Sequence, residues 1–439
     1  MPIQISCQKV CAYYQLIYIK MIKKISAFVL ILISSVSWSQ DNTASPYSYY
    51  GLGEIKFKGT HDVRAMGGVS IFNDSIQLNI VNPASFSKLK ATAFTIGATT
   101  STTKFTTAIE NEKAQRTTID YLAIGLPYGK FGFTFGIMPY SAVGYKIENT
   151  IIEADNSERN RRNYGNGNVN KIYLGAAYNL SQKLSFGFDL GYNFGDITTE
   201  YIESVYSPIV LQLRSRERNN SKVTGMSLNT GFLYKTKINA KLDLNAGLTY
   251  HPTATLTSEN TRKVATILYN INGVELVSEE NDIPVNDTKM KIPAVFTFGL
   301  GVGESKKWAI GSEVTFSNNS EMTNRFGSIE NVSFENSKKV ALGGYYIPKY
   351  DSFGNYFSRI VYRGGLRYEN TGMVINNTSI NDYALTFGLG LPVGYSKINL
   401  GLEYGKKGTR TNGLIEENYI NVTVALSLSD LWFIKRKID

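Results

Sequence analysis

The sequence predicts an all-β fold: a transmembrane antiparallel β-barrel of about 14 strands with an N-terminal plug. Three observations support this prediction. Apolar residues alternate with polar ones over long stretches, short connections alternate with long ones, and no run of 18 or more apolar residues follows about residue 40. In residues 184–195, every even position through Phe194 is large and apolar, and every odd position is small or polar. Such a stretch is a strand with one apolar face and one polar face, as a wall between lipid and lumen requires.

The same pattern recurs along the chain. The predicted strands span residues 91–105, 117–128, 131–147, 169–180, 183–200, 222–236, 241–258, 288–302, 306–319, 337–346, 357–369, 381–392, 396–408 and 417–430. Tight connections such as Gly129-Lys130 alternate strictly with long polar stretches at 148–168, 201–221 and 259–288, which we expect to be loops. Outer-membrane barrels sort their connections in this way, whereas a soluble β-sandwich has no reason to. An even strand number also places both termini in the periplasm of a Gram-negative bacterium.

The N-terminus has the pattern of a targeting segment. Residues 21–39 read as a signal peptide, with Lys23-Lys24, an apolar stretch and a cleavage site after Ser39 or Gln40. Residues 1–20 then read as a mis-annotated extension, although a longer signal n-region is the alternative. Both cysteines of the chain lie there, so we expect a mature protein without disulfides, thiolate metal sites or a lipidated cysteine. Removal of four leader lysines lowers the formal charge from +10 to +6.

The remaining chain divides into three predicted parts. Residues 40–88 form a periplasmic arm and an N-terminal hatch, residues 89–431 the outer-membrane barrel, and residues 432–439 a basic C-terminal tail. The hatch is compact and broken, because turn-forming residues interrupt any regular element within residues 64–86. Its candidate gating residues are Gly67, Gly68, Asn73, Asp74, Asn82, Pro83 and Ala84.

These residues carry a family resemblance. A secreted chain with Gly-Gly, an Asn-Asp turn and Asn-Pro-Ala before fourteen strands resembles the FadL-type transporters of hydrophobic compounds. The resemblance implies that the N-terminal segment plugs the barrel and that apolar substrates leave sideways at a bend in the third strand. The third predicted strand carries Pro139 in its middle, between Gly136 and Gly144, and a proline there implies a bulge or break. The ending Trp432-Phe433 followed by a basic tail also resembles barrels of type IX secretion systems and related flavobacterial-type outer-membrane proteins, some of which are accessory subunits.

The charged residues predicted to face the lumen have a structural and a functional interpretation. The lumen-side charges Asp189, Asp243, Arg363, Arg367, Glu369 and Glu403 are expected to form a polar network. That network either stiffens the barrel and binds the hatch, which we favour, or filters ions. The arginine-rich stretches at 157–163 and 214–218 are either a solvated outer face or a surface for anionic glycans and lipid head groups.

Three functions follow in order of preference. The first is passive uptake of small hydrophobic compounds, similar to long-chain fatty acids, through a hatch-gated lateral path. The alternative is a non-transport accessory or scaffold barrel of an outer-membrane secretion or assembly complex. An enzyme is the weakest, because His61 and His251 are the only histidines and no serine–histidine pair stands out. We expect no catalytic residue, metal or cofactor, and the scattered basic residues argue against nucleic acid. The expected partners are outer-membrane lipid, an apolar ligand and other outer-membrane proteins.

Overall fold

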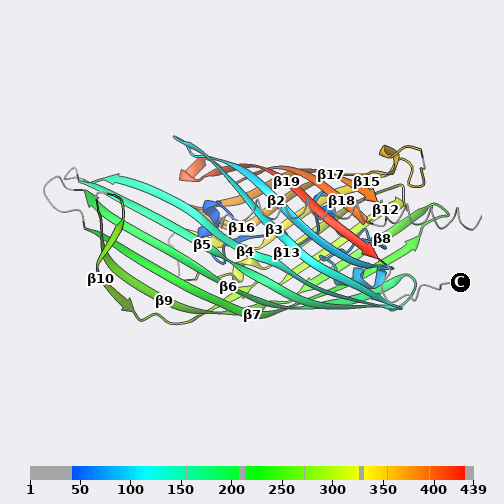
Figure 1. The fold of residues 1–439 in the computed structure, drawn as a ribbon, viewed down its shortest axis with the longest axis horizontal. Helices are drawn as coiled ribbons and strands as arrows, with labels where there is room; N and C mark the ends of the chain where they lie inside the picture. Colours follow the sequence, from blue (N-terminus) through cyan, green and yellow to red (C-terminus); the bar gives the residue numbers. More distant parts are fainter. Residues whose placement is uncertain are drawn as a thin grey trace, which may run out of the picture. The chain divides into compact units, whose positions relative to one another are not determined.

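Long antiparallel strands form a single closed wall in the computed structural model (Figure 1). The structure describes residues 42–153, 157–206, 213–270, 272–325, 331–352, 354–394 and 396–430. The predicted extension, signal peptide and basic tail lie outside these residues. None of the helices in the described part is long and apolar enough to cross a membrane.

The wall has fourteen strands, and three of them are each interrupted and so consist of two or three consecutive β-segments. The strands are β2 (Thr92–Thr106), β3 (Asn111–Tyr128), β4 (Phe131–Ile152), β5 (Glu158–Asn179), β6 (Leu184–Tyr206), β7 (Arg214–Lys237), β8 (Leu242–His251) with β9 (Ala254–Tyr269), β10 (Glu275–Ile283) with β11 (Thr288–Ile292) and β12 (Val295–Glu304), β13 (Trp308–Ser317), β14 (Val332–Phe334) with β15 (Ser337–Tyr346), β16 (Val361–Ile375), β17 (Thr378–Val393), β18 (Ser396–Lys407) and β19 (Glu416–Asp430). Pairing of β19 with β2 closes the barrel. The predicted fold class is confirmed.

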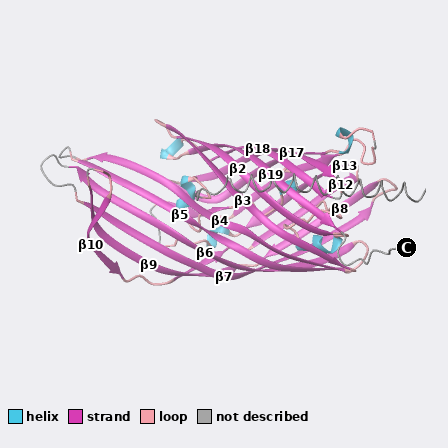
Figure 2. Cartoon of the chain, viewed as in Figure 1, coloured by secondary structure: helices cyan, strands magenta, loops and turns pink. Residues whose placement is uncertain are grey.

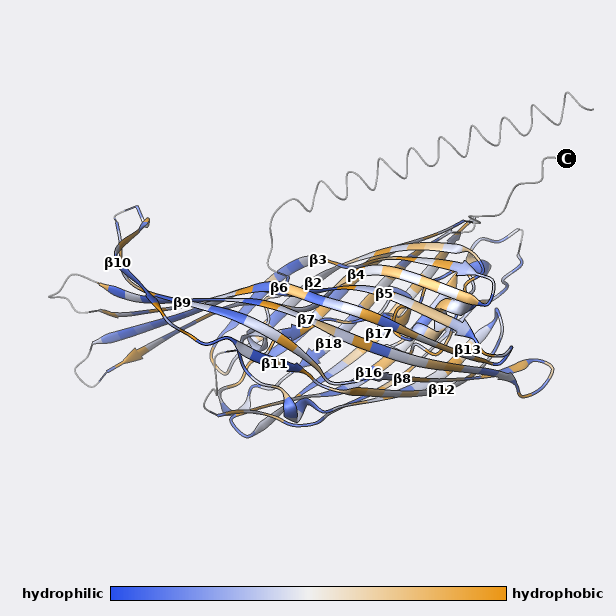
Figure 3. Ribbon diagram, turned by 90° about the horizontal axis from the view of Figure 1, so that it is seen from below, coloured by the Kyte–Doolittle hydropathy of each residue, from blue (hydrophilic) through white to orange (hydrophobic). Residues whose placement is uncertain are grey.

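Alternation gives the wall its two faces. Phe131, Phe133 and Phe135 on β4 are exposed on the outside, whereas Gly132 and Thr134 between them are buried on the inside. The same outward rows on the other strands form an apolar belt, which faces lipid in a barrel of this kind. Apolar residues mark the barrel body in Figure 3, where the projecting strand ends carry more hydrophilic residues.

The prediction of three long loops at 148–168, 201–221 and 259–288 is wrong. Most of these residues continue β4 to β7, β9 and β10, which project beyond the barrel body (Figure 2). Their alternation disappears because no lipid covers them, yet cross-strand ion pairs such as Arg218–Glu200, at 2.6 Å, support the ladder. The strict alternation of connections also fails at both ends of the barrel. A two-residue turn, Asn376-Asn377, joins β16 to β17 at the end where long connections were predicted. Residues 347–360 form a long connection at the end where the others, such as Gly129-Lys130, are tight turns, hereafter the short-turn end.

One seam of the wall is paired over part of its length. β3 pairs with β4 from Leu122–Ile137 to Tyr128–Phe131, a span of seven residues on each strand. Beyond that point β3 continues beside β2, and β4 continues beside β5. The two strands therefore separate within a membrane barrel's usual strand length of about nine to eleven residues.

Candidate functional site

The N-terminal segment, residues 42–91, contacts strands around the lumen. It contains η1 (Pro46–Tyr49), β1 (Glu54–Ile55), the short helix α2 (His61–Arg64) and the 3-10 helix η2 (Pro83–Lys88), drawn in blue in Figure 1. Phe86 is fully buried, and it packs with Leu78 and Leu89 against inward side chains of the wall. The segment thus fills space that an open channel would leave to water or substrate.

Wall glycines let the backbone of this segment approach the strands closely. A Cβ added at Gly132 would lie 2.0 Å from the carbonyl oxygen of Phe86, and one at Gly365 would lie 2.3 Å from the backbone nitrogen of Gly67. Gly187 on β6 and Gly343 on β15 meet the backbone of the segment in the same way, and Gly231 on β7 meets the side chains of Asn82 and Pro83. The wall and the segment are therefore fitted to each other on several sides of the lumen.

The predicted hatch residues hold the segment in this shape. Gly67 and Gly68 have φ angles of 69° and 103°, which a residue with a side chain rarely adopts. The backbone nitrogen of Gly67 donates to the Thr386 hydroxyl at 2.9 Å. Asn73 donates to the carbonyl of Ile71 two residues before it, and Asp74 pairs with Lys397.

Asn82 links η2 to β7, through Phe232, and to β8, through Leu248. Its side-chain nitrogen donates to the carbonyl oxygen of Phe232 at 3.1 Å, and its side-chain oxygen accepts from the backbone nitrogen of Ala84 at 3.0 Å. Pro83 then occupies the first turn of the helix, where its missing N–H costs nothing. Asn82-Pro83-Ala84 is thus a capped helix start attached to the wall.

A buried chain of charges connects α2 with β3, β16, β17 and β18. Nε2 of His61 lies 2.6 Å from a carboxylate oxygen of Asp120, and Arg64 lies 3.4 Å from Glu403. Arg367 then joins Glu403 at 2.8 Å and Asp382 at 3.0 Å. Buried charges need such partners, because an isolated one is costly to remove from water.

The six predicted lumen residues do not form one network. Arg367 and Glu403 meet in the chain just described, whereas Asp189 pairs with Lys171 at 2.6 Å, and Asp243 pairs with Lys235 at 2.9 Å. Arg363 donates to Asn399 at 3.1 Å, and Glu369 lies on β16 opposite Asp382. Sequence patterns did not identify His61, Arg64, Asp120 or Lys397 as members of these ion pairs. The charge of these residues within the predicted hatch and strands suggests that each has a polar partner. Nothing in the sequence shows which residue that partner is.

The separated seam carries the predicted bend. The β4–β5 register shifts between Pro139 and Ser141. Close to it, a Cβ at Gly136 would lie 2.6 Å from the Tyr173 hydroxyl, and one at Gly144 would lie 2.1 Å from the carbonyl oxygen of Thr43. The backbone therefore runs tightly against neighbours on both sides of the bend.

The N-terminal segment replaces β3 as the neighbour of β4 here. β1 pairs antiparallel with β4, Glu54 opposite Ala142 and Ile55 opposite Ser141. The Ser141 hydroxyl donates to the carbonyl of Leu52 at 2.8 Å, and the Leu52 side chain is buried in an apolar cluster with Tyr140, Val143, Tyr145, Val169, Ile197, Val223, Leu256, Met290 and Ile292. The inner side of the bend is apolar, and it is occupied by the chain itself.

Lys58 lies beside this bend with a perturbed charge. Its ammonium nitrogen is 4.1 Å from the centre of the Tyr140 ring. Burial, together with the positive charges of Lys171 and Lys339, lowers the pKa of Lys58 to about 7. The lysine therefore changes charge near neutral pH.

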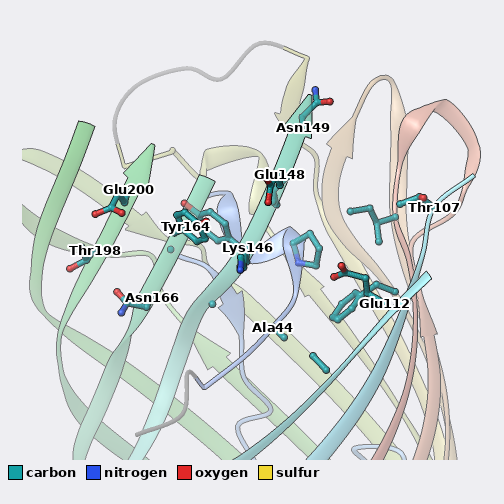
Figure 4. Close-up of a pocket in the computed structure, with 18 of the residues that line it drawn as sticks. Ala44, Thr107, Glu112, Lys146, Glu148, Asn149, Tyr164, Asn166, Thr198 and Glu200 are labelled. Atoms are coloured by element: carbon teal, nitrogen blue, oxygen red, sulfur yellow. The ribbon is translucent and has the colours of Figure 1, made fainter. Parts of the chain in front are cut away.

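A hollow of about 1950 Å³ lies at the end opposite the short turns (Figure 4). Ala44 of the N-terminal segment contributes to its lining, Thr107 and Glu112 line it from the β2–β3 hairpin, and Lys146 and Glu148 line it from β4. Charged side chains of both signs lie among apolar ones in the lining, so the hollow offers an occupant both kinds of contact.

A closed antiparallel barrel that is filled by its own N-terminal segment, and whose third strand carries a register shift and parts from the second, is an outer-membrane barrel of the FadL-like fold. The chain belongs to the BamG family, whose model matches residues 21–439. A search of curated proteins finds no match.

Solved structures are similar at low sequence identity. The Pseudomonas putida toluene transporter TodX is 16% identical, with a TM-score of 0.55 over 85% of this chain and 98% of that one. The monoaromatic hydrocarbon channel CymD is 14% identical, with a TM-score of 0.54 over 88% and 99% of the two chains. The Ralstonia pickettii toluene transporter TbuX is 13% identical, with a TM-score of 0.53 over 84% and 97%. These proteins are transport channels rather than enzymes, and at such identities they establish the fold alone.

Proposed function

We propose that this chain is a closed accessory barrel of an outer-membrane protein assembly and does not act as a pore. The observation that carries the proposal is the fit of the N-terminal segment to the wall. Its backbone abuts glycines on four strands, and its charged side chains His61, Arg64 and Asp74 pair with charged side chains of the wall.

Displacing the segment would be costly. Moving α2 would take both His61 and Arg64 away from Asp120, and a buried charge left without its partner costs about 3–5 kcal/mol. A passive channel needs small barriers, because no energy source drives it. A fixed segment instead gives the barrel a rigid body on which other proteins can assemble.

The family and the projecting strands support the same proposal. The name BamG hints at protein partners. β5, β6 and β7 each span more than twenty residues, which is about twice what a membrane crossing requires. The excess lies outside the membrane and offers a surface to proteins.

Native mass spectrometry of the mature protein, extracted from its own membrane in mild detergent, tests the proposal. We expect other proteins bound in stoichiometric amounts and no apolar small molecule in the lumen. A lone barrel that carries a fatty acid or an aromatic hydrocarbon would contradict it.

Uptake of small hydrophobic compounds is the second candidate, favoured by the seam. β3 and β4 part within the apolar belt, the bend at Pro139 lies at that point, and an apolar cluster lines its inner side. In this function the Leu52 side chain blocks the path between the lumen and the seam. Leu52→Ala should therefore increase uptake of radiolabelled toluene by cells. Equal uptake by wild-type cells, the variant and cells that lack the chain would exclude it.

A further inference from the structure

Beyond the paired part of the seam, two strand edges face each other with no described strand paired between them. On β3 they are residues 111–121, which pair with β2, and on β4 residues 145–152, which pair with β5. Apart from these pairings, the described part of the chain places no strand against either edge. We call the space between them the β3–β4 slot; it opens into the hollow of Figure 4.

The hydrogen-bonding groups of β4 point into this slot at every second residue. The carbonyl of Tyr140 accepts from the backbone nitrogen of Lys56 at 3.0 Å, and the backbone nitrogen of Gly144 donates to the Ser48 hydroxyl at 3.1 Å. Even-numbered residues of β4 therefore direct their backbone groups away from β5. The same parity directs the backbone groups of the next even residues, Lys146, Glu148 and Thr150, into the slot.

β1 shows that this edge accepts a strand. Glu54 and Ile55 pair antiparallel with Ala142 and Ser141. The residues that precede β1 turn away from β4, because Gly53 has a φ of 93° and Gly51 a φ of 57°. The ladder that β1 begins thus stops where the unpaired part of β4 starts.

The side chains around the slot suit a polypeptide rather than a hydrocarbon. Lys113 and Glu112 line it from β3, and Lys146 and Glu148 line it from β4. Ile152 at the end of β4 is 70% exposed. Charges of both signs, apolar residues such as Ile147 and Ile152, and a row of backbone donors and acceptors match an extended peptide with mixed side chains. Unpaired edges of this kind readily take up another strand.

We propose that an extended segment of a partner protein enters the β3–β4 slot and continues the ladder of β1 by pairing antiparallel with β4. This inference rests on the proposed function, since it names the surface through which the accessory barrel holds its partner. The segment pairs with the backbone of Lys146, Glu148 and Thr150, and its alternate side chains meet the charges of the hollow.

Hydrogen–deuterium exchange measured with residue resolution tests the pairing. Two samples are compared in one detergent: the complex isolated from its own membrane, and the chain produced in a host that lacks the partners. The slot-facing amides of Lys146, Glu148 and Thr150 should exchange about tenfold more slowly in the complex. Amides of β19, which already pair on both sides, should not change. Equal exchange of the slot-facing amides in the two samples would overturn the proposal.

A matched pair of variants isolates the backbone contact. Glu148→Pro removes the slot-facing N–H, and Glu148→Ala keeps it, while both lose the same side-chain bonds to Asn160 and Arg162. We expect Glu148→Pro, but not Glu148→Ala, to abolish the exchange protection at the other slot-facing amides, with both barrels equally resistant to heat in detergent. Equal protection in the two variants would contradict strand pairing.

The outcomes separate this inference from the proposed function. If proteins co-purify but the slot amides exchange as in the free chain, the partner binds elsewhere and only the slot is wrong. If nothing co-purifies with the wild-type chain, both proposals fail.

Discussion

The close approach of the N-terminal segment to β16 predicts opposite outcomes for two adjacent glycines. Gly365 faces the segment, and a Cβ there would lie 2.3 Å from the backbone of Met66 and Gly67. Gly364 faces the other way, and the nearest atom to a Cβ there is the carbonyl oxygen of Thr386, at 3.8 Å. Gly365→Ala and Gly364→Ala therefore add the same methyl group to neighbouring residues with different surroundings.

The structure gives the size of the difference. Backbone atoms cannot rotate away as a side chain can, so the alanine at 365 must shift the segment or the strand. Overpacking of this kind costs about 1–3 kcal/mol. The gain of about 0.4–1 kcal/mol from a less flexible unfolded chain is common to both variants and cancels in the comparison. With an m value of about 2 kcal/mol/M in urea, the midpoint of Gly365→Ala should fall by about 0.5–1.5 M relative to Gly364→Ala.

Urea unfolding in detergent micelles, followed by tryptophan fluorescence, measures these midpoints. Limited proteolysis in the absence of urea adds a local measurement, since a displaced segment should be cut sooner in Gly365→Ala than in Gly364→Ala. Midpoints that agree within about 0.2 M, together with equal cleavage, would refute a segment that is fitted to the wall.

Three further predictions concern charge and capping. Arg367→Met leaves buried Asp382 without its ion-pair partner and Glu403 with Arg64 alone, and it should lower the free energy of unfolding by about 3–5 kcal/mol. Arg162→Met at an exposed pair should cost less than about 1 kcal/mol, and urea unfolding compares the two variants. The folded chain holds the pKa of Lys58 near 7, whereas the ordinary pKa of a lysine is 10.5. Between pH 7 and 10.5 the unfolded chain therefore binds more protons than the folded chain does. The free energy of unfolding should therefore rise with pH across that window and stay level below it, and Lys58→Met should remove this rise in a pH series of unfolding curves. Asn82→Ala removes the cap of η2 and its bond to the wall, and it should cost about 0.5–2 kcal/mol and speed proteolysis of the segment; unchanged cleavage would show that Asn82 does not hold the segment.

The strands could be read from the sequence where lipid imposes a pattern. Residues 184–195 alternate because one face meets hydrocarbon, and β6 begins at Leu184. The same strand continues to Tyr206 through residues predicted to be a loop. Beyond the membrane both faces are polar, so periodicity vanishes although the ladder persists. Pro139 could be placed because proline cannot donate to a ladder, and the register does shift beside it.

Less of the candidate site could be predicted from the sequence. A lumen network was expected, but Arg64 and Asp120 were absent from it, and Asp243 and Arg363 lie elsewhere. Lumen-facing charges could be recognised one strand at a time. Which of them meet depends on how the N-terminal segment folds against strands that are hundreds of residues away.

By itself the sequence determined the all-β wall, its fourteen strands and the broken segment before them, because these follow from local rules of alternation, turn formation and proline geometry. Only the tertiary structure decided that β3 and β4 part, that β1 takes the place of β3 and that glycines seal the segment to the wall. Those features depend on the distance between backbones that are remote in sequence, and no local pattern records that distance.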